Sequence, residues 1–372
     1  MSLQTIIVAH LYHPGSAASN RILAYVKGFL ELGLDVHLVL GCKAREEKPI
    51  LAGVDVIMVG NDSRSSVTRE MASAIKRVYQ KDTGVILVYG TPSLCWYLPH
   101  PRYHIFYECT EIPFFGRQRT LKTFVVETVK MILAKRATGM LVISQALKEY
   151  FLGKGIRRIE VINMFVDNSR FEHKQSNAKE KYIAYCGWIS EFKDGVDCLI
   201  KAFAEMKEIY QDFRLYLIGD FISFNDKIRL ENLVESLKLN DSVVFTGKVA
   251  PEKMPDLLCS AKILALARPN NEQSKYGFPT KLGEYLATGI PVVVTDVGEI
   301  GSFLYDKQNC IVTRPDDPHA FCEALKWVIS HPEEAANIAR RGKLTVRQEF
   351  SYSTQSKKAF EFFERVTQSL KN

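Results

Sequence analysis

The sequence predicts an α/β protein built from two doubly wound, parallel-sheet domains. Its 372 residues exceed what one ordinary hydrophobic core supports, because domains usually hold roughly 100 to 200 residues. Short apolar runs alternate with helical patterns, which is typical of parallel strands joined by helices. The alternation restarts after a polar stretch, EHKQSNAKEK at 172–181. We therefore predict one Rossmann-like domain over 1–170 and a second over 171–353, facing a central cleft.

In the first predicted domain, the run TIIVA at 5–9 has the composition of a buried strand. A helix is expected from about Ala17 to Leu32, where Gly33 ends it, and a strand at 36–40 completes a β-α-β unit. Further strands of this domain are expected at 54–59, 85–89, 104–107 and 140–143.

In the second predicted domain, five apolar runs are interpreted as strands: YIAYCG, RLYLIG, SVVFTG, KILALA and PVVVT. Helices are predicted between them, at about 196–209, 226–237, 251–259 and 279–287. The final helix, over about 354–372, could pack on either domain, including back on the first.

Composition favours a soluble chain in a reducing compartment. Hydrophobic residues make up 47% and charged residues 24%, which are ordinary values for a globular protein. The longest uncharged stretch, 83–101, is broken by glycines and prolines, and the N-terminus lacks the features of a signal peptide. The eight cysteines form no C-x-x-C pair, so neither a disulfide framework nor a zinc site is expected. We predict a cytoplasmic protein.

The excess of positive charge lies in the first half of the chain. Residues 1–170 hold 22 Lys/Arg against 14 Asp/Glu, whereas 171–372 hold 27 against 28. A basic half indicates an anionic partner, such as a phosphate-bearing substrate or a membrane surface, or it merely keeps the protein soluble. Nucleic acid is not expected, because no known binding module is recognised.

The segment RQRTLKTFVVETVKMILAKRATG, 117–139, is both basic and apolar. It predicts a helix with Leu121, Phe124, Val125, Thr128 and Ile132 on one side. We favour packing of this stripe in the core. Peripheral contact with an anionic membrane, at its inner face, stays open as the alternative.

The first loop argues against a nicotinamide-dependent enzyme. The sequence HLYHPGSAASN contains one glycine, Gly15, where the dinucleotide fingerprint G-x-G-x-x-G needs three.

A short helix bracketed by Pro279 and Gly289 is the strongest candidate for an anion site. Its first backbone N–H groups, from Thr280 and Lys281, and the positive end of its dipole would face a bound anion. Glu284 lies four residues after Thr280 and so shares its face. A carboxylate there suits sugar hydroxyls, although it could also only complement the helix dipole.

The stretch YGFPTKLGEYLATGIPV, 276–292, resembles the E-G-F-G-x-x-x-x-E-A-M-A-x-G-x-P-V segment of the family 4 glycosyltransferases. The order of segments resembles this family over nearly the whole chain. The resemblance implies the GT-B fold, with the C-terminal domain binding a nucleotide-sugar donor. It also implies that Glu284 holds the ribose, that Pro279, Thr280 and Lys281 face the diphosphate, and that Gly277 and Phe278 contact the donor sugar.

Other segments add to the resemblance. YCGWISEFKDG is similar to the family's G-R-L-x-x-x-K-G segment, which implies that Lys193 neutralises the diphosphate. The F-x-G-x-V turn that ends at Val249 would hold the base. Gly15 and Ser16 in the first loop would approach the phosphate or the acceptor.

The chain also departs from the family pattern. Tyr276 replaces the first glutamate of the motif, for which Glu272 could substitute, and Trp188 replaces the arginine of the diphosphate clamp. Arg268 and Lys281 are candidates to take over from that arginine. Where the family often has a histidine facing the acceptor, this chain has Glu108, followed by Glu111. We predict acceptor-side or catalytic roles for these two carboxylates, although they could also be ordinary loop acids.

Together these features predict a retaining glycosyltransferase that moves a hexosyl or related sugar from a UDP- or GDP-sugar to a glycan or lipid-linked acceptor. Polysaccharide synthesis would be one such role. No cofactor is expected, and the absence of a D-x-D sequence argues against a metal clamp. Two alternatives stay open: a nucleotide-sugar 2-epimerase on the same fold, and a non-catalytic nucleotide-sugar-binding module.

Overall fold

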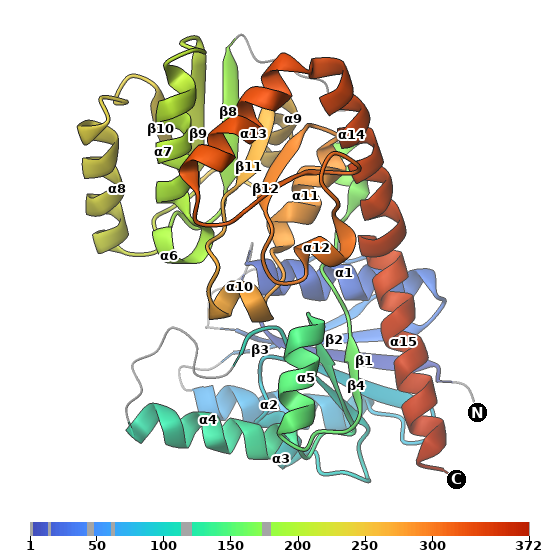
Figure 1. Ribbon diagram of the computed structural model, residues 1–372. Helices are drawn as coiled ribbons and strands as arrows, with labels where there is room; N and C mark the ends of the chain where they lie inside the picture. Colours follow the sequence, from blue (N-terminus) through green and yellow to red (C-terminus); the bar gives the residue numbers. More distant parts are fainter. Residues whose placement is uncertain are drawn as a thin grey trace. The chain divides into compact units, whose positions relative to one another are not determined.

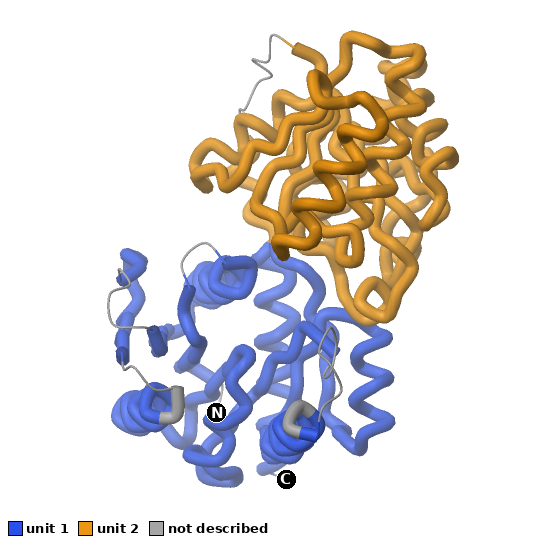
Figure 2. The backbone as a smooth tube through the Cα atoms, turned by 90° about the vertical axis from the view of Figure 1, so that its left-hand side faces the viewer, with its two compact units in different colours: residues 1–165, 352–372 blue, residues 166–351 orange. Residues whose placement is uncertain are grey.

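The computed structural model describes residues 3–13, 16–42, 48–60, 64–112, 121–172 and 180–371. The chain divides into two compact units, shown in two colours in Figure 2. Unit 1 comprises residues 1–165 together with 352–372, and unit 2 comprises residues 166–351.

Unit 1 is centred on a seven-stranded, fully parallel sheet with the order β3-β2-β1-β4-β5-β6-β7. The strands are β1 (Thr5–Leu11), β2 (Asp35–Cys42), β3 (Asp55–Gly60), β4 (Gly84–Tyr89), β5 (Ile105–Cys109), β6 (Gly139–Val142) and β7 (Ile159–Val161). The strand order reverses between β1 and β4. Such a switch point is where open α/β sheets leave a crevice at the carboxyl ends of their strands.

Six helices belong to this unit within the described residues: α1 (Ala17–Glu31), α2 (Arg64–Val78), α3 (Leu94–Tyr97), α4 (Leu121–Ala134), α5 (Gln145–Gly153) and α15 (Tyr352–Ser369). The last of these packs along α1 (Figure 1), so the chain's final helix joins the core of unit 1. The two helices approach closely at Gly28, where an added Cβ would lie 2.3 Å from Ser356 Oγ. A larger residue at 28 would push the helices apart.

Unit 2 is centred on a six-stranded parallel sheet with the order β10-β9-β8-β11-β12-β13, and its order reverses between β8 and β11. The strands are β8 (Lys181–Cys186), β9 (Phe213–Ile218), β10 (Val243–Gly247), β11 (Ile263–Leu266), β12 (Val292–Thr295) and β13 (Ile311–Thr313). The α-helices are α6 (Glu191–Asp194), α7 (Val196–Lys207), α8 (Phe224–Ser236), α9 (Met254–Ser260), α10 (Glu272–Tyr276), α11 (Thr280–Thr288), α12 (Ile300–Phe303), α13 (Pro318–Ser330) and α14 (Pro332–Thr345). A 3-10 turn, η1 (Asn168–Phe171), precedes β8, and a π-helical turn, η2 (Val346–Phe350), follows α14.

Every strand predicted from an apolar run is present. The structure adds β7 and β13, which hold only three residues each and are too short to give a periodic signal. Both lie at the edge of a sheet, where they are placed by pairing with β6 and β12.

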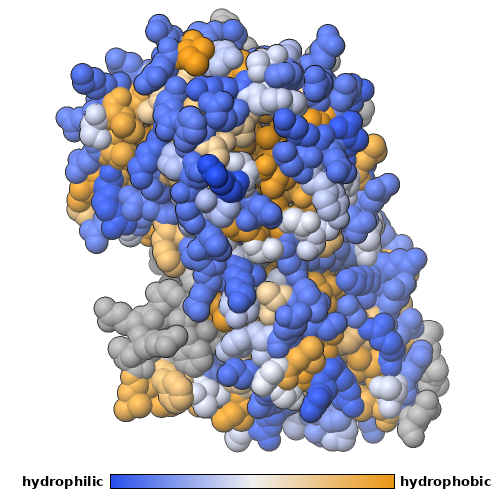
Figure 3. Space-filling view, in the orientation of Figure 1, coloured by the Kyte–Doolittle hydropathy of each residue, from blue (hydrophilic) through white to orange (hydrophobic). Residues whose placement is uncertain are grey.

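The predicted burial of the α4 stripe is wrong. Leu121, Phe124, Val125 and Ile132 are all exposed, and Figure 3 shows hydrophobic side chains over this helix at the lower left. The helix instead buries Glu127 and Ala134. A helical pattern shows which residues share a face, but the packing of neighbouring elements decides which face turns inward.

Candidate functional site

The amino end of α11 has the features of an anion site. Pro279 is its N-cap and Gly289, in the left-handed conformation at φ 78°, ends it. No side chain caps this end, and the first turn carries no acid. Within the described residues, the backbone N–H groups of Thr280 and Lys281 make no hydrogen bond. These free donors and the helix dipole therefore favour a negative ligand.

A buried carboxylate, Asp194, holds the side chain of Lys281 in place. Lys281 Nζ lies 2.5 Å from Asp194 Oδ2 and 2.9 Å from Tyr185 Oη. Tyr185 Oη is also 2.7 Å from the same carboxylate oxygen. Burial by itself would raise the pKa of Asp194, but the charges of Lys281 and Arg268 and the hydrogen bonds outweigh it, so this pKa is lowered.

Arg268 shares this carboxylate. Its Nε lies 3.6 Å from Asp194 Oδ1, and its side chain is only 5% exposed. Among the described residues this Nε has no hydrogen-bond partner. The guanidinium group also borders the loop before α11, because a Cβ added at Gly277 would be 4.0 Å from Arg268 Nη2. Two cations thus converge on one carboxylate, which leaves an excess of positive charge beside α11.

The loop between β8 and α7 brings a third cation to this end of the sheet. Ser190 caps the short helix α6 by accepting a hydrogen bond from the Lys193 amide, and Gly195 ends it at φ 63°. A Cβ at Gly195 would lie 1.9 Å from the carbonyl oxygen of Ala267, so only glycine fits there. Burial lowers the pKa of Lys281, and the charge of nearby Lys193 acts in the same direction. Since these segments follow β8 and β11, the cations lie at the switch point of the sheet.

Glu284, predicted to hold a ribose, forms an ion pair with Arg170 of η1. Arg170 Nη1 lies 2.5 Å from Glu284 Oε1, and the two side chains are 34% and 30% exposed. The carboxylate is therefore oriented from one side and stays accessible to a ligand from another.

The other predicted donor-side residues differ in accessibility. The side chain of Phe278 is buried against Phe303 and Phe350, at ring distances of 5.7 and 5.5 Å, so only its backbone is available to a ligand. Gly277 follows α10, and Tyr276 at the end of that helix is partly exposed. Val249, also partly exposed, follows β10.

Trp188, which stands where the resembling family has an arginine, is 54% exposed and follows β8. It supplies an exposed aromatic surface after β8 but no charge. Arg268 and Lys281 both contact Asp194 and supply positive charge at this end of β8 and β11.

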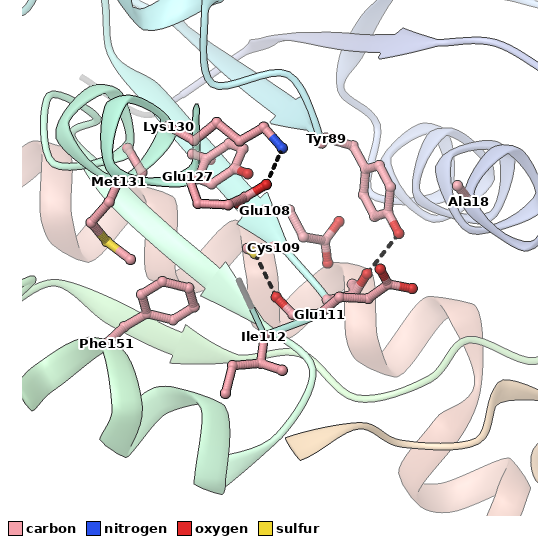
Figure 4. Close-up of a pocket in the computed structure, with 14 residues that line it drawn as sticks. Ala18, Tyr89, Glu108, Cys109, Glu111, Ile112, Glu127, Lys130, Met131 and Phe151 are labelled. Carbon is pink, nitrogen blue, oxygen red and sulfur yellow. Dashed lines mark hydrogen bonds and ion pairs between the residues drawn. The ribbon is translucent and has the colours of Figure 1, made fainter. Parts of the chain in front are cut away.

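Unit 1 holds a separate pocket of about 360 Å³ at the carboxyl ends of β4 and β5. Figure 4 shows its lining, in which Tyr89, Glu108 and Glu111 form a polar part and Met131 and Phe151 an apolar part. Tyr89 Oη lies 2.8 Å from Thr110 Oγ1, which orders the loop after β5. A pocket with both parts suits a ligand that is polar at one end and apolar at the other.

The two predicted acceptor-side carboxylates lie in different environments. Glu108 is fully buried, and its Oε1 accepts hydrogen bonds from Arg21 Nε at 2.9 Å, Arg21 Nη2 at 2.6 Å and Tyr25 Oη at 2.9 Å. Burial would lower the pKa of Arg21, but the charge of Glu108 reverses this and raises it. Glu108 Oε2 has no hydrogen-bond partner within the described part of the chain. Glu111 is exposed at the pocket and therefore accessible to a ligand.

The first loop is described in part. Ser16 is the N-cap of α1 and accepts a hydrogen bond from the Ser19 amide at 3.2 Å. Gly15 lies outside the described residues. Within those residues, no group of three or more His, Cys, Asp or Glu side chains is arranged to hold a metal ion.

Sequence reasoning missed Asp194, Tyr185 and Arg21. Asp194 follows Lys193 directly and looks like one more charge on a solvated turn. The sequence did indicate that Arg21 is buried, because it precedes Tyr25 by one helical turn on the buried face of α1. A buried arginine needs a carboxylate partner, although only the fold identifies Glu108 as that partner.

Comparison with known proteins shows that part of unit 2 is similar in sequence to glycosyltransferases. Residues 180–331 match the family model described as glycosyl transferases group 1. D-inositol 3-phosphate glycosyltransferase of Corynebacterium urealyticum is 25% identical over 198 residues, which cover 49% of this chain and 45% of that protein. Mannosylfructose-phosphate synthase of Agrobacterium fabrum is 27% identical over 165 residues, or 43% of this chain and 35% of that protein. The match thus spans less than half the length of these relatives, and it confirms the predicted resemblance to glycosyltransferases for residues 180–331.

Solved structures resemble the whole chain. Sucrose-phosphate synthase from Thermosynechococcus elongatus gives a TM-score of 0.75 at 16% identity, covering 98% of this chain and 100% of that one. Anabaena HepE, solved in complex with UDP-glucose, gives a TM-score of 0.73 at 18% identity, covering 99% of each chain. At these identities the likeness shows the fold alone. The fold is GT-B, as predicted.

Proposed function

We propose that this chain, whose second unit matches the group 1 glycosyl transferases, is a retaining, family 4 type glycosyltransferase. It would transfer a hexosyl or related sugar from a nucleoside-diphosphate sugar to an acceptor hydroxyl. The observation that carries this proposal is the convergence of the free amino end of α11 with Lys281, Arg268 and Lys193.

The donor would bind in unit 2. Its diphosphate would accept hydrogen bonds from the amides of Thr280 and Lys281, while the three cations balance its charge. Glu284 would accept hydrogen bonds from the ribose hydroxyls, with Arg170 orienting the carboxylate. The backbone near Val249 would contact the base, and Gly277 and Phe278 would offer backbone groups to the sugar. A UDP-sugar is the first donor to test, because HepE was solved with UDP-glucose.

Catalysis would come mainly from stabilising the leaving nucleoside diphosphate. Positive groups fixed beforehand at that position act without further reorganisation, and their effect grows when water is excluded. Because side chains supply this charge, we propose that transfer proceeds without a metal ion and without another cofactor. Activity that persists after treatment with EDTA would support this, and loss of activity restored by Mg²⁺ would contradict it.

The acceptor would bind at the pocket of unit 1. Glu111, exposed in its lining, would accept a hydrogen bond from the acceptor hydroxyl and assist its deprotonation. Glu108 would instead position the loop, because Arg21 and Tyr25 already occupy one of its oxygens.

The experiment follows release of labelled nucleotide from UDP- and GDP-sugars, with and without glycan or lipid-linked acceptor extracts. Release that requires acceptor is the expected result. Release without acceptor would point to a 2-epimerase instead, and binding without release would point to a non-catalytic module. Either of these would overturn the proposal.

A further inference from the structure

The helix α4 carries a continuous apolar surface on its outer side. Leu121, Phe124 and Ile132 are 81%, 60% and 57% exposed. The valines Val125 and Val129, at 51% and 49%, fill the space between them. Monomeric soluble proteins rarely leave such contiguous apolar area in water, so a surface of this kind marks an interaction site.

The inner side of the same helix carries an ion pair beside two apolar residues, which departs from the usual arrangement of an amphipathic helix. Glu127 has a side chain only 7% exposed, and Lys130 Nζ contacts its carboxylate at 2.7 Å. Both residues line the pocket of unit 1 with Met131 and Ala134 (Figure 4). A helix selected only to stabilise the core would bury its apolar side and expose its ion pair. The outward apolar side therefore has another role.

The charges around this surface are positive. Lys135 and Arg136 are exposed basic residues at the carboxyl end of this surface, whereas Lys130 is paired with Glu127 on the inner side of the helix. Because Glu127 is turned inward, the described side chains on the outer side of α4 include no carboxylate. The surface thus combines apolar area with positive charge, and an anionic partner matches both.

An aromatic residue lies at the carboxyl end of the helix. The Arg136 guanidinium stands 4.9 Å from the centre of the Trp96 ring, and Trp96 is 63% exposed. Tryptophan prefers the boundary between apolar chains and polar headgroups, and arginine binds lipid phosphates. The pair therefore suits the headgroup layer of a membrane.

We infer that α4 docks on an anionic lipid bilayer. Phe124, Ile132 and their apolar neighbours would enter the boundary of the acyl chains, while Lys135, Arg136 and Trp96 would contact headgroups. The helix would lie in the plane of the membrane. Its 14 residues span only about 21 Å, and none of the described helices is long and apolar enough to cross a bilayer. A second copy of the chain matches less well, because pairing α4 with itself would bring like charges together.

Docking through α4 would hold the pocket of unit 1 close to the membrane, because the same helix lines it. Resting on the proposed function, this identifies the acceptor class as a glycan carried on a membrane lipid. Docking itself needs neither donor nor acceptor, so it can be tested when transfer fails.

The test is cosedimentation of the full chain with vesicles of phosphatidylcholine mixed with phosphatidylglycerol, and with vesicles of phosphatidylcholine alone. We expect binding to the anionic vesicles that weakens with added salt, and much less binding to the neutral ones. Phe124→Gln combined with Ile132→Gln should reduce binding by about tenfold or more, since both side chains leave the bilayer.

A matched control is Phe224→Gln combined with Ile228→Gln. These residues are the same types, 74% and 41% exposed on α8, and their replacement should leave binding unchanged. Should the α4 variant fail to fold, quenching of Trp96 by brominated lipid can be measured with Trp188 and Trp327 replaced by phenylalanine. The inference would be overturned if the wild type failed to bind the anionic vesicles, or if both variants lost binding equally. It would also be overturned if the wild type formed a dimer that the α4 substitutions dissociate.

Discussion

The ammonium group of Lys281 is held 2.5 Å from the buried carboxylate of Asp194. This contact joins the first turn of α11 to the end of α6, and Arg268 lies against the other carboxylate oxygen. Asp194 therefore fixes two cations that would otherwise repel each other. Since one carboxylate neutralises only one of them, positive charge remains for a ligand.

Removing this carboxylate charge should destabilise unit 2. In Asp194→Asn, the buried Arg268 and the partly exposed Lys281 lose their counter-ion, and breaking a buried pair costs about 3 to 5 kcal/mol. Denaturant unfolding would measure the loss. Asp197→Asn is a suitable control, because its pair with Lys201 lies on the surface of α7, where the change should stay below about 1 kcal/mol. Equal effects of the two variants would remove the special role given to Asp194.

Nucleotide affinity should depend on Glu284. In Glu284→Ala the ribose would lose its charged acceptor, which should weaken binding of UDP or GDP by about 1.5 to 3 kcal/mol, as measured by titration calorimetry. Glu205→Ala provides the comparison, since Glu205 is an exposed acid paired with His319 elsewhere in unit 2. Unchanged affinity in Glu284→Ala would mean that the carboxylate only serves its ion pair with Arg170.

Substitution of Glu108 should mainly lower the stability of the protein, whereas substitution of Glu111 should mainly lower its activity. Glu108→Gln weakens the buried pair with Arg21, so the free energy of unfolding should fall by about 3 kcal/mol. Glu111→Gln should leave stability nearly unchanged and lower the transfer rate by roughly 10²-fold or more, since general-base help has this size. The two readouts are an unfolding curve and kcat with acceptor present. A fully active Glu111→Gln enzyme would exclude this residue as the base.

Acid should destabilise unit 1 through His10. Burial lowers the pKa of His10 to about 4 in the folded protein, from an ordinary value of 6.5. Between these two pH values the unfolded chain binds the proton and the folded chain does not, so stability falls as the pH falls. The loss should approach roughly 3 kcal/mol near pH 4.

Thermal melts between pH 7 and pH 4 would measure this change, with His10→Asn as the test and the exposed His319→Asn as the control. His10→Asn should flatten the pH dependence, whereas His319→Asn should retain it. A wild-type stability that does not change across this range would contradict the role of His10.

Much of the fold was accessible from the sequence because it depends on local patterns. Apolar runs such as TIIVA and PVVVT formed β1 and β12, and Pro279 and Gly289 bracketed α11 as expected. The three-residue strands β7 and β13 were missed, since pairing with a neighbour creates them and no local period marks them.

Local sequence patterns were sufficient to predict the two-sheet architecture, the position of α11 and the resemblance to glycosyltransferases. Which charged side chains form ion pairs depends on the tertiary structure. It placed Asp194 between Lys281 and Arg268, paired Glu108 with Arg21 across 87 positions of the chain, and turned the apolar side of α4 outward. Contacts between distant residues, and the choice of which helix face is covered, depend on how whole elements pack, which no local pattern encodes.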